Sequence, residues 1–198
     1  IASIIKYDEK NAPNKTIVLN KKLSPKKNGM IGIIGAGNFT KMTLLPLLKG
    51  CNANIKHIVS SGGVNGTVLA KKYNIIQSTT DYNLVLNDNS IGLVMITTRH
   101  DLHAKLVIKS LNKGKHVFVE KPLALNVEEA EALCALSKQQ KKVLMVGHLL
   151  QYHSAFLKLK SIVSDGGLGK LQYIYSNRLN LGKFRNEENI LWSFEKNI

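Results

Sequence analysis

Short apolar runs alternate with helical patterns along residues 30–147, and this alternation restricts the fold more than any other feature of the chain. The apolar runs predict strands at 30–34, 54–61, 74–78, 91–98, 116–120 and 143–147. Apolar residues at helical spacing predict helices at 39–50, 64–73, 81–88, 101–115 and 126–142, with Asp81 and Asn126 as N-caps of the third and the fifth. Because strands that alternate with helices form βαβ units, the sequence predicts an α/β domain with a doubly wound parallel sheet over residues 30–147.

The residues on either side of this domain have a different character. Residues 1–29 are polar and rich in lysine, and they predict a linker with one short strand at 16–19. After Gly147 the pattern predicts a helix at 153–167 and a longer strand at 170–182. One helix and one strand do not bury a sheet face alone, so residues 148–198 are expected to begin a second α+β domain that is incomplete in this chain.

The net charge of +15 is concentrated in the first half of the chain. No Asp or Glu occurs between Lys10 and Thr80, a stretch that contains eleven lysines if Lys10 is included. Such a stretch suits an anionic partner or forms a solvated face. Aromatic residues make up only 6% of the chain and no nucleic-acid-binding motif occurs, so a nucleic acid is not the expected partner.

Several classes of protein and site are excluded by what the sequence lacks. No apolar run approaches the roughly 18–20 residues of a membrane helix, and the first residues lack the features of a signal peptide. Cys51 and Cys134 form no CxxC pair, which predicts two reduced thiols in a cytoplasmic protein. No metal-ligand spacing, GxSxG motif or Walker motif occurs, so neither a metal site nor a membrane partner is expected.

A glycine turn, GIIGAGNFT at residues 32–40, follows the first strand of the predicted domain. Gly35 permits a tight turn, Gly37 lets the backbone approach a pyrophosphate, and the N–H groups of Asn38, Phe39 and Thr40 at the helix start attract the anion. Thr40 replaces the usual Gly or Ala, so either the helix is displaced or the Thr40 hydroxyl reaches a phosphate. A sharp turn with no ligand is the alternative, but the strand–turn–helix setting favours a dinucleotide.

The end of the second strand bears on the choice between NAD and NADP. An NAD-preferring site carries an acid about 20 residues after the turn, where it binds the ribose 2′-hydroxyl. Here Ser60 and Ser61 stand at that point and no acid follows nearby. The two serines are the predicted hydroxyl partners, and Lys71 or Lys72 is expected within reach of a 2′-phosphate. The cofactor is therefore predicted to be NAD or NADP, with NADP slightly favoured.

The stretch ITTRHDLHA follows the fourth strand and adds further predicted cofactor contacts. Ligands of a doubly wound sheet bind at the carboxyl ends of its strands. This placement selects Thr97, Thr98, His100 and His103 as cofactor-binding residues. For either histidine, a helix cap or a surface position is the alternative.

The stretch HVFVEKPLA, residues 116–124, places a carboxylate and an amine together at the end of the fifth strand. Glu120 and Lys121 then lie at the same sheet edge as the glycine turn, and both are predicted to contact the cofactor. Pro122 restricts Lys121 to an extended backbone. The alternative is a surface Glu-Lys-Pro turn with no chemical role.

Together, the glycine turn and the EKP stretch resemble the glucose-fructose oxidoreductase/inositol dehydrogenase (Gfo/Idh/MocA) family over about residues 30–198. The resemblance implies a Rossmann fold and hydride transfer between a nicotinamide and a hydroxyl-bearing carbon of a sugar, nucleotide sugar or cyclitol. It also implies that Lys121 is catalytic, contacting substrate and nicotinamide and assisting proton transfer, with Glu120 and Pro122 as its frame. Members are often homo-oligomers.

The same resemblance shows where this chain departs from the family. The family stretch TPNxxH reads TRHDLH here, so Thr98 and His103 match while Arg99 and His100 replace proline and asparagine. The stretch WSFEKNI stops before the aspartate–histidine segment of the family, and the catalytic histidine is expected beyond Ile198. The first ten residues resemble the end of an alcohol dehydrogenase-like domain that some members carry upstream. The chain is thus expected to be a fragment, and the alternative function is a dinucleotide-binding product without catalysis.

Overall fold

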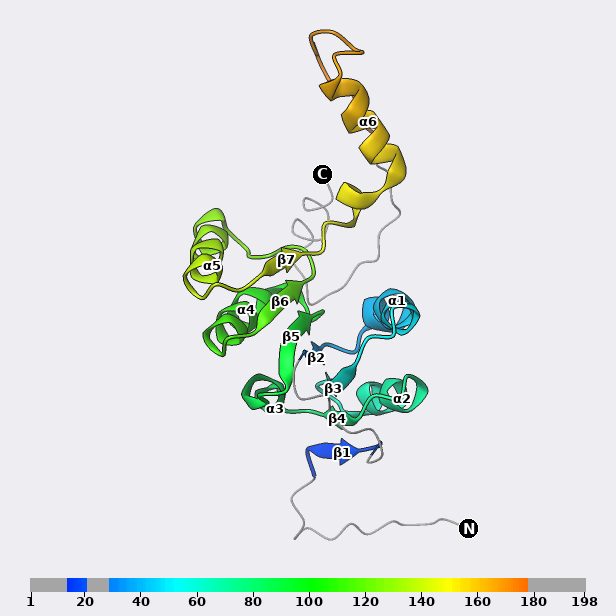
Figure 1. Cartoon of the computed structure of the whole chain (residues 1–198), viewed down its shortest axis with the longest axis vertical. Coiled ribbons are helices and arrows are strands. Elements are labelled where there is room, and N and C mark those ends of the chain that lie inside the picture. The colour runs from blue at the N-terminus through cyan, green and yellow to red at the C-terminus, as the bar shows by residue number, and fades with distance from the viewer. Residues whose placement is uncertain (1–13, 21–28, 178–198) are drawn as a thin grey trace, which may run out of the picture. The chain divides into compact units, whose positions relative to one another are not determined.

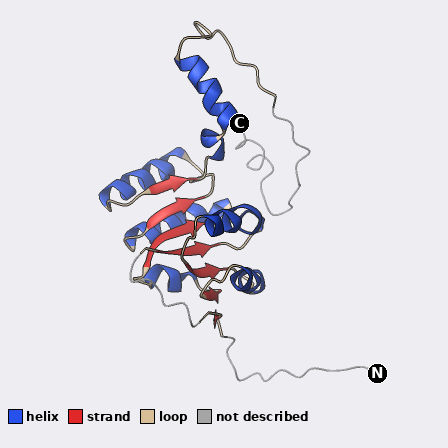
Figure 2. Ribbon diagram, turned by 45° about the vertical axis from the view of Figure 1, so that its right-hand side comes forward, coloured by secondary structure: helices blue, strands red, loops and turns tan. Residues whose placement is uncertain are grey.

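A computed structural model describes residues 14–20 and 29–177 of the chain (Figure 1). The chain divides into two compact units, residues 1–147 and residues 148–198. In the described part of the first unit, a seven-stranded sheet lies between two layers of helices (Figure 2). Within the described residues, no helix is long and apolar enough to cross a membrane.

The strand order is β1-β4-β3-β2-β5-β6-β7, and every neighbouring pair is parallel except β1 with β4. The strands are β1 (Thr16–Val18), β2 (Met30–Ile34), β3 (Ile55–Val59), β4 (Gln77–Thr79), β5 (Ile91–Ile96), β6 (His116–Val119) and β7 (Leu144–Val146). From β2 the chain winds outward through β3 and β4, then returns to the other side of β2 through β5, β6 and β7. This order confirms the predicted doubly wound α/β sheet and places its switch point between β2 and β5.

The helices of the first unit alternate with these strands, as the sequence predicts. They are α1 (Leu45–Gly50), α2 (Val64–Lys72), α3 (Tyr82–Asn87), α4 (His103–Asn112) and α5 (Val127–Gln139), with a π-helical turn η1 (Thr40–Leu44) and a 3-10 turn η2 (His100–Leu102). Asp81 caps α3 by accepting from the N–H of Asn83, and Asn126 caps α5 by accepting from the N–H of Glu129. Both predicted caps are confirmed. In the second unit, η3 (Leu149–Tyr152) precedes α6 (Ser154–Ser164).

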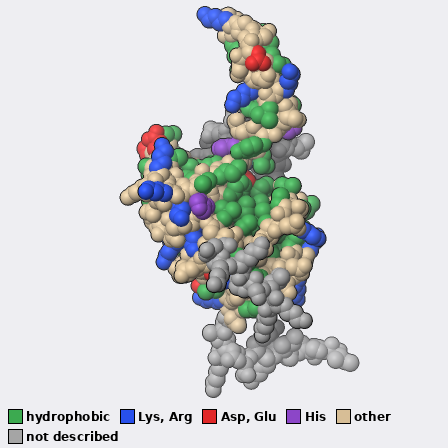
Figure 3. Space-filling view, in the orientation of Figure 1, with side chains coloured by type: hydrophobic (Ala, Val, Ile, Leu, Met, Phe, Trp, Pro, Cys, Tyr) green, Lys and Arg blue, Asp and Glu red, His purple; other side chains and the backbone are tan. Residues whose placement is uncertain are grey.

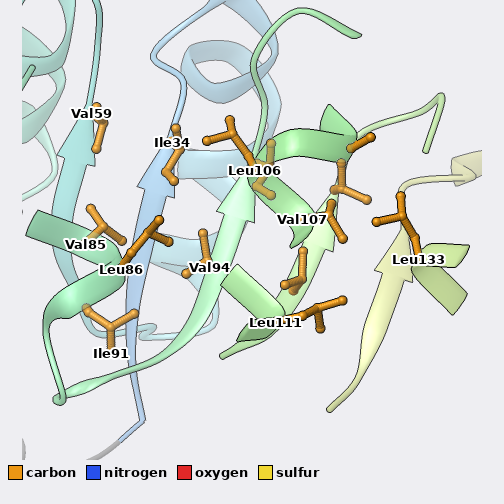
Figure 4. Close-up of a cluster of buried hydrophobic side chains, with 14 of the residues drawn as sticks. Ile34, Val59, Val85, Leu86, Ile91, Val94, Leu106, Val107, Leu111 and Leu133 are labelled. Atoms are coloured by element: carbon orange, nitrogen blue, oxygen red, sulfur yellow. The ribbon is translucent and has the colours of Figure 1, made fainter. Parts of the chain in front are cut away.

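Side chains alternate along the central strands between two apolar cores, one on each face of the sheet. On one face, Ile34 and Val94 pack with residues of α3, α4 and α5, among them Leu106 and Leu133 (Figure 4). On the other face, Ile33 packs with residues of β3, α1 and α2. Each large aliphatic side chain buried in this way contributes roughly 1.5–3 kcal/mol to folding. The two cores together hold the ends of the strands in one row.

The predicted helix at 39–50 begins differently from expectation. Residues 40–44 form a wider π-helical turn, in which the N–H of Leu45 donates to the carbonyl of Thr40. Pro46 follows directly and has no N–H to continue ordinary α-helical pairing at that point. The helix after the glycine turn therefore begins with a change of helical pitch, which the sequence did not predict.

Strand β4 begins at Gln77, whereas the sequence predicts a strand at 74–78. Asn74 adopts a φ of 54°, and the N–H of Ile75 donates to the carbonyl of Ala70 at 2.9 Å. Residues 74–76 therefore close the end of α2 before the strand can start.

The strand predicted at 170–182 is wrong for residues 170–177, which form no strand; residues 178–182 lie outside the described part of the chain. A strand depends on a hydrogen-bonded neighbour. The second unit, as far as it is described, contains no strand that could pair with this segment.

Candidate functional site

The predicted site residues lie side by side along the carboxyl edge of the sheet. Gly35, Thr97 and Glu120 each follow a strand, and each donates its backbone N–H to the last residue of a neighbouring strand, at 3.0, 2.9 and 2.9 Å respectively. Ser60 and Gly147 extend the same row, with N–H···O distances of 3.1 and 2.9 Å. Five strands therefore deliver one residue each to a continuous edge, where ligands of doubly wound sheets bind.

The glycine turn has the geometry that a dinucleotide requires. Gly35 adopts a φ of 120°, and an added Cβ would lie 2.7 Å from the carbonyl carbon and oxygen of Thr97. At Gly37 an added Cβ would meet nothing within 4 Å, so the space beside its Cα is open. The first N–H groups of the following helix have no acceptor inside the helix. This open space beside unpaired donors fits a pyrophosphate.

Thr40 lies inside the turn, and the structure corrects the prediction that its hydroxyl reaches a phosphate. The residue is 0% exposed. Its hydroxyl donates to the carbonyl of Gly35 at 3.0 Å and lies 2.7 Å from the hydroxyl of Thr97, which contacts the same carbonyl at 3.0 Å. The two threonines therefore hold the glycine turn from within, and only the backbone N–H of Thr40 can serve an anion.

The two residues before Thr40 differ in their surroundings. Asn38 is exposed at the start of the helix. Phe39 is partly buried and packs against the core on the α1 and α2 face. The Phe39 side chain therefore anchors the turn, and its contribution to an anion site is limited to its backbone.

The Glu120–Lys121–Pro122 segment leaves the sheet beside Thr97. Lys121 is exposed, and its peptide bond to Pro122 is cis. The Glu120 carboxylate lies against Gly147, where an added Cβ would be 2.6 Å from Oε1. Sequence reasoning missed Gly147, although a glycine that ends the next strand beside EKP is a usable signal. A larger residue there would displace Glu120.

His103 is buried between loops of the cofactor edge, and the prediction that its ring binds the cofactor is corrected. Its ring is buried, with Nδ1 at 2.7 Å from the carbonyl oxygen of Pro122 and Nε2 at 3.1 Å from that of Thr98. Both ring nitrogens are therefore committed to the protein. His100 lies in η2, half-buried, and the hydroxyl of Thr98 donates to the carbonyl of Arg99 at 3.2 Å.

The end of β3 carries the two predicted serines in unequal roles. The Ser60 oxygen accepts from the N–H of Gly66 at 3.1 Å and so holds the first turn of α2. Ser61 is exposed and presents its hydroxyl at the edge. Lys71 and Lys72 stand at the other end of α2, where the Lys72 ammonium lies 5.4 Å from the centre of the Tyr73 ring. The prediction that either lysine reaches a 2′-phosphate is therefore wrong, because α2 runs away from the carboxyl edge.

Lys and Arg side chains of the described residues form no single patch on the face shown in Figure 3, where they are scattered around an apolar area. Five of the eleven lysines of the basic first half, namely 10, 21, 22, 26 and 27, lie outside the described residues.

Among the residues that are described, no group of three or more His, Cys, Asp or Glu could hold a metal ion. Cys51 and Cys134 are both exposed and free.

The opposite, amino edge of the sheet holds a cluster of charged groups around Asp88. Its Oδ2 accepts from the Lys56 ammonium at 2.6 Å and lies 2.8 Å from His57 Nε2. Its Oδ1 accepts from both the N–H and the hydroxyl of Ser90, at 2.9 and 2.7 Å. The Lys115 ammonium donates to the carbonyl oxygen of Asp88 at 2.7 Å. We call these five residues the Asp88 cluster.

The cluster shifts the protonation equilibria of its members. Burial alone would raise the pKa of the Asp88 carboxyl, but hydrogen bonds from Lys56, His57 and Ser90 outweigh burial and hold that pKa well below its usual value. Burial lowers the pKa of His57 more than its hydrogen bond to Asp88 raises it. Burial likewise lowers the pKa of Lys115, against the attraction of Asp88. The charged carboxylate and the neutral imidazole are therefore the favoured forms in the folded chain.

Known proteins similar to this chain are oxidoreductases. Residues 30–148 match the family model of oxidoreductases with an NAD-binding Rossmann fold, GFO_IDH_MocA. The uncharacterized oxidoreductase YdgJ of Escherichia coli is 32% identical over 150 residues, covering 76% of this chain and 43% of that protein. Inositol 2-dehydrogenase of Salmonella typhimurium is 30% identical over 112 residues, covering 56% of this chain and 32% of that protein.

A similar fold also occurs among solved structures. KijD10, a 3-ketoreductase from Actinomadura kijaniata in complex with NADP and TDP-benzene, superposes with a TM-score of 0.65 at 22% identity. The match covers 70% of this chain and 43% of that one. The chain therefore spans less than half the length of these relatives.

Proposed function

The chain belongs to the Gfo/Idh/MocA family of oxidoreductases, and from that premise we propose that it supplies the dinucleotide-binding part, with a catalytic lysine, of an NAD(P)-dependent dehydrogenase. One observation carries the proposal. The glycine turn, with open space beside Gly37, and the loop that carries Lys121 leave the same sheet edge, with Thr97 between them. This arrangement suits a cofactor that lies along the edge, with its reactive end toward the lysine.

The substrate class proposed is a sugar, nucleotide sugar or cyclitol that carries a secondary hydroxyl. The names of relatives support it, since one is an inositol 2-dehydrogenase and the 3-ketoreductase structure contains a TDP compound and NADP. In the oxidative direction the substrate carbon gives up a hydride, and its hydroxyl gives up a proton. When bound, the nicotinamide accepts that hydride at C4.

The residues of this chain would bind, orient and handle the proton. The backbone N–H groups at the glycine turn hold the pyrophosphate, and the Thr40–Thr97 pair fixes the turn that presents them. Lys121, exposed at the end of β6, reaches the substrate oxygen. It either accepts the hydroxyl proton as an amine or stabilises the developing negative charge as a cation.

The finer cofactor choice we propose is NADP over NAD. Ser61 offers a hydroxyl at the end of β3, and α2 has no acidic residue in its first turn. Asp81, after the neighbouring strand β4, is committed to capping α3 through its Oδ1. No carboxylate therefore follows β3 directly to repel a 2′-phosphate, and the NADP of the 3-ketoreductase complex agrees with this choice. Fluorescence titration of the chain with NADPH and NADH tests it, and an affinity tenfold or more in favour of NADH overturns it.

Lys121→Ala tests the catalytic assignment. The variant should bind NADPH as tightly as the parent chain, because Lys121 is exposed and the anion is proposed to bind at the glycine turn. In a protein that carries this chain together with a complete substrate-binding domain, turnover of sugar or cyclitol substrates, followed by NADPH absorbance, should fall to background. Lys138→Ala, an exposed lysine in the last turn of α5, is the control and should change neither quantity. Unchanged turnover in Lys121→Ala would refute the assignment, and a parent chain that binds neither dinucleotide would refute the function.

A further inference from the structure

His103 joins the two loops that carry the proposed chemistry. It is the first residue of α4, and its ring is 1% exposed. Nδ1 lies 2.7 Å from the carbonyl oxygen of Pro122, directly after the catalytic lysine. Nε2 lies 3.1 Å from the carbonyl oxygen of Thr98, directly after the hydroxyl that braces the glycine turn. One imidazole therefore spans from the cofactor loop to the lysine loop.

The chemistry of the two partners determines how the ring must bond. A carbonyl oxygen only accepts hydrogen bonds, so each ring nitrogen bonds its partner only if it carries a hydrogen. A neutral ring has one such hydrogen and would leave the other nitrogen facing an oxygen lone pair. Both carbonyl oxygens lie within hydrogen-bond distance of the ring, so either tautomer donates to one loop and lies against the other.

We propose that His103 is a positioning residue whose ring bridges the carbonyl oxygens of Pro122 and Thr98 and fixes the lysine loop to the cofactor loop. The proposal rests on the proposed function, because it assigns His103 a role in aligning Lys121 with the cofactor. His103 touches neither substrate nor cofactor. Its effect passes through the backbone on both sides, since Thr97 braces the carbonyl of Gly35 and Pro122 adjoins Lys121.

Two substitutions separate the two contacts of the His103 ring. In His103→Asn the side-chain amide can stand where Nδ1 stands and keep the bond to Pro122, while the bond to Thr98 is lost. In His103→Gln the longer amide can stand where Nε2 stands and keep the bond to Thr98, while the bond to Pro122 is lost. Ser110→Ala is the matched control, because it removes a different buried hydrogen bond of α4, the 2.7 Å bond to the carbonyl of Leu106.

Hydrogen exchange measures the opening of each loop separately, and NADPH titration measures the effect on cofactor binding. We expect His103→Asn to speed amide exchange at residues 97–99 and to weaken NADPH binding by about tenfold, the scale of one lost hydrogen bond. We expect His103→Gln to speed exchange at residues 121–124 and to leave NADPH affinity within twofold. Ser110→Ala should change neither loop. A merely structural role for His103 predicts instead that both variants loosen both loops alike, and that result overturns the proposal.

Hydrogen exchange needs neither turnover nor cofactor, so it tests His103 independently of the proposed function. A chain that binds no dinucleotide, but in which the two variants loosen residues 97–99 and 121–124 separately, would refute the proposed function while leaving the bridging role of His103 standing.

Discussion

The two edges of one sheet use polar residues in opposite ways. At the amino edge, four donors from neighbouring residues satisfy the Asp88 carboxylate. At the carboxyl edge, the polar groups of the glycine turn are braced from below by Thr40 and Thr97, and the space beside Gly37 stays open. Polar groups that satisfy one another stabilise a fold, whereas donors that border open space can bind a ligand. The comparison predicts that mutations at the amino edge lower the unfolding free energy, whereas mutations at the carboxyl edge weaken dinucleotide binding.

The largest effect is expected from Asp88→Ala at the amino edge. The change removes the acceptor of Lys56, His57 and Ser90 at one step, and it leaves partly buried charges without their counter-charge. Loss of such a set costs about 3 kcal/mol of unfolding free energy. Urea denaturation measures that loss. NADPH affinity, measured well below the unfolding midpoint, should stay within twofold because the carboxyl edge is intact.

Glu131→Gln serves as the control for Asp88→Ala. Glu131 is exposed on α5, so its change should move the unfolding free energy by less than about 0.5 kcal/mol. The comparison between the edges would be contradicted if Asp88→Ala left the unfolding free energy unchanged while weakening NADPH binding.

The converse change, Gly37→Val, should weaken NADPH binding by at least tenfold and barely affect stability. The new side chain would occupy the open space beside Gly37, where the pyrophosphate is proposed to lie. Gly50→Val is the matched control, since an added Cβ at Gly50 also meets nothing within 4 Å but lies at the end of α1. Equal binding losses in the two variants would show that the effect is not local to the turn.

Much of this arrangement could be predicted from the sequence, because it depends on short-range patterns. Apolar runs gave the six strands of the parallel sheet, and the capping roles of Asp81 and Asn126 followed from residues at helix starts. The glycine turn and the EKP stretch were located for the same reason. In a parallel sheet every strand ends at the carboxyl edge, so residues that directly follow a predicted strand are placed there by the topology alone.

The directions of individual side chains could not be predicted, because partners far apart in sequence determine them. Thr40 turns inward because its hydroxyl bonds to the carbonyl of Gly35 and to the hydroxyl of Thr97. The His103 ring is held by the carbonyl of Pro122, a partner 19 residues further along the chain. The same limit explains Lys71 and Lys72, since the direction of α2 relative to the edge is known only once β3 and β4 are paired.

The smallest expected effect is a dependence of stability on pH that comes from the amino edge alone. Burial lowers the pKa of His57 in the folded chain, so the unfolded chain takes up this proton first as the pH falls through about 6.5. The unfolding free energy should therefore begin to fall below that pH. The pKa of Asp88 is also lowered, so its stabilisation is present above about pH 4 and is lost as the pH drops further.

Urea denaturation between pH 8 and pH 3 should show a shallow loss of unfolding free energy followed by a steeper one. His57→Gln keeps a donor toward Asp88 but does not titrate, so it should flatten the first loss and keep the second. Parallel curves for the two proteins would mean that the shallow loss arises elsewhere, and the amino edge would then stabilise the sheet without sensing pH in this range.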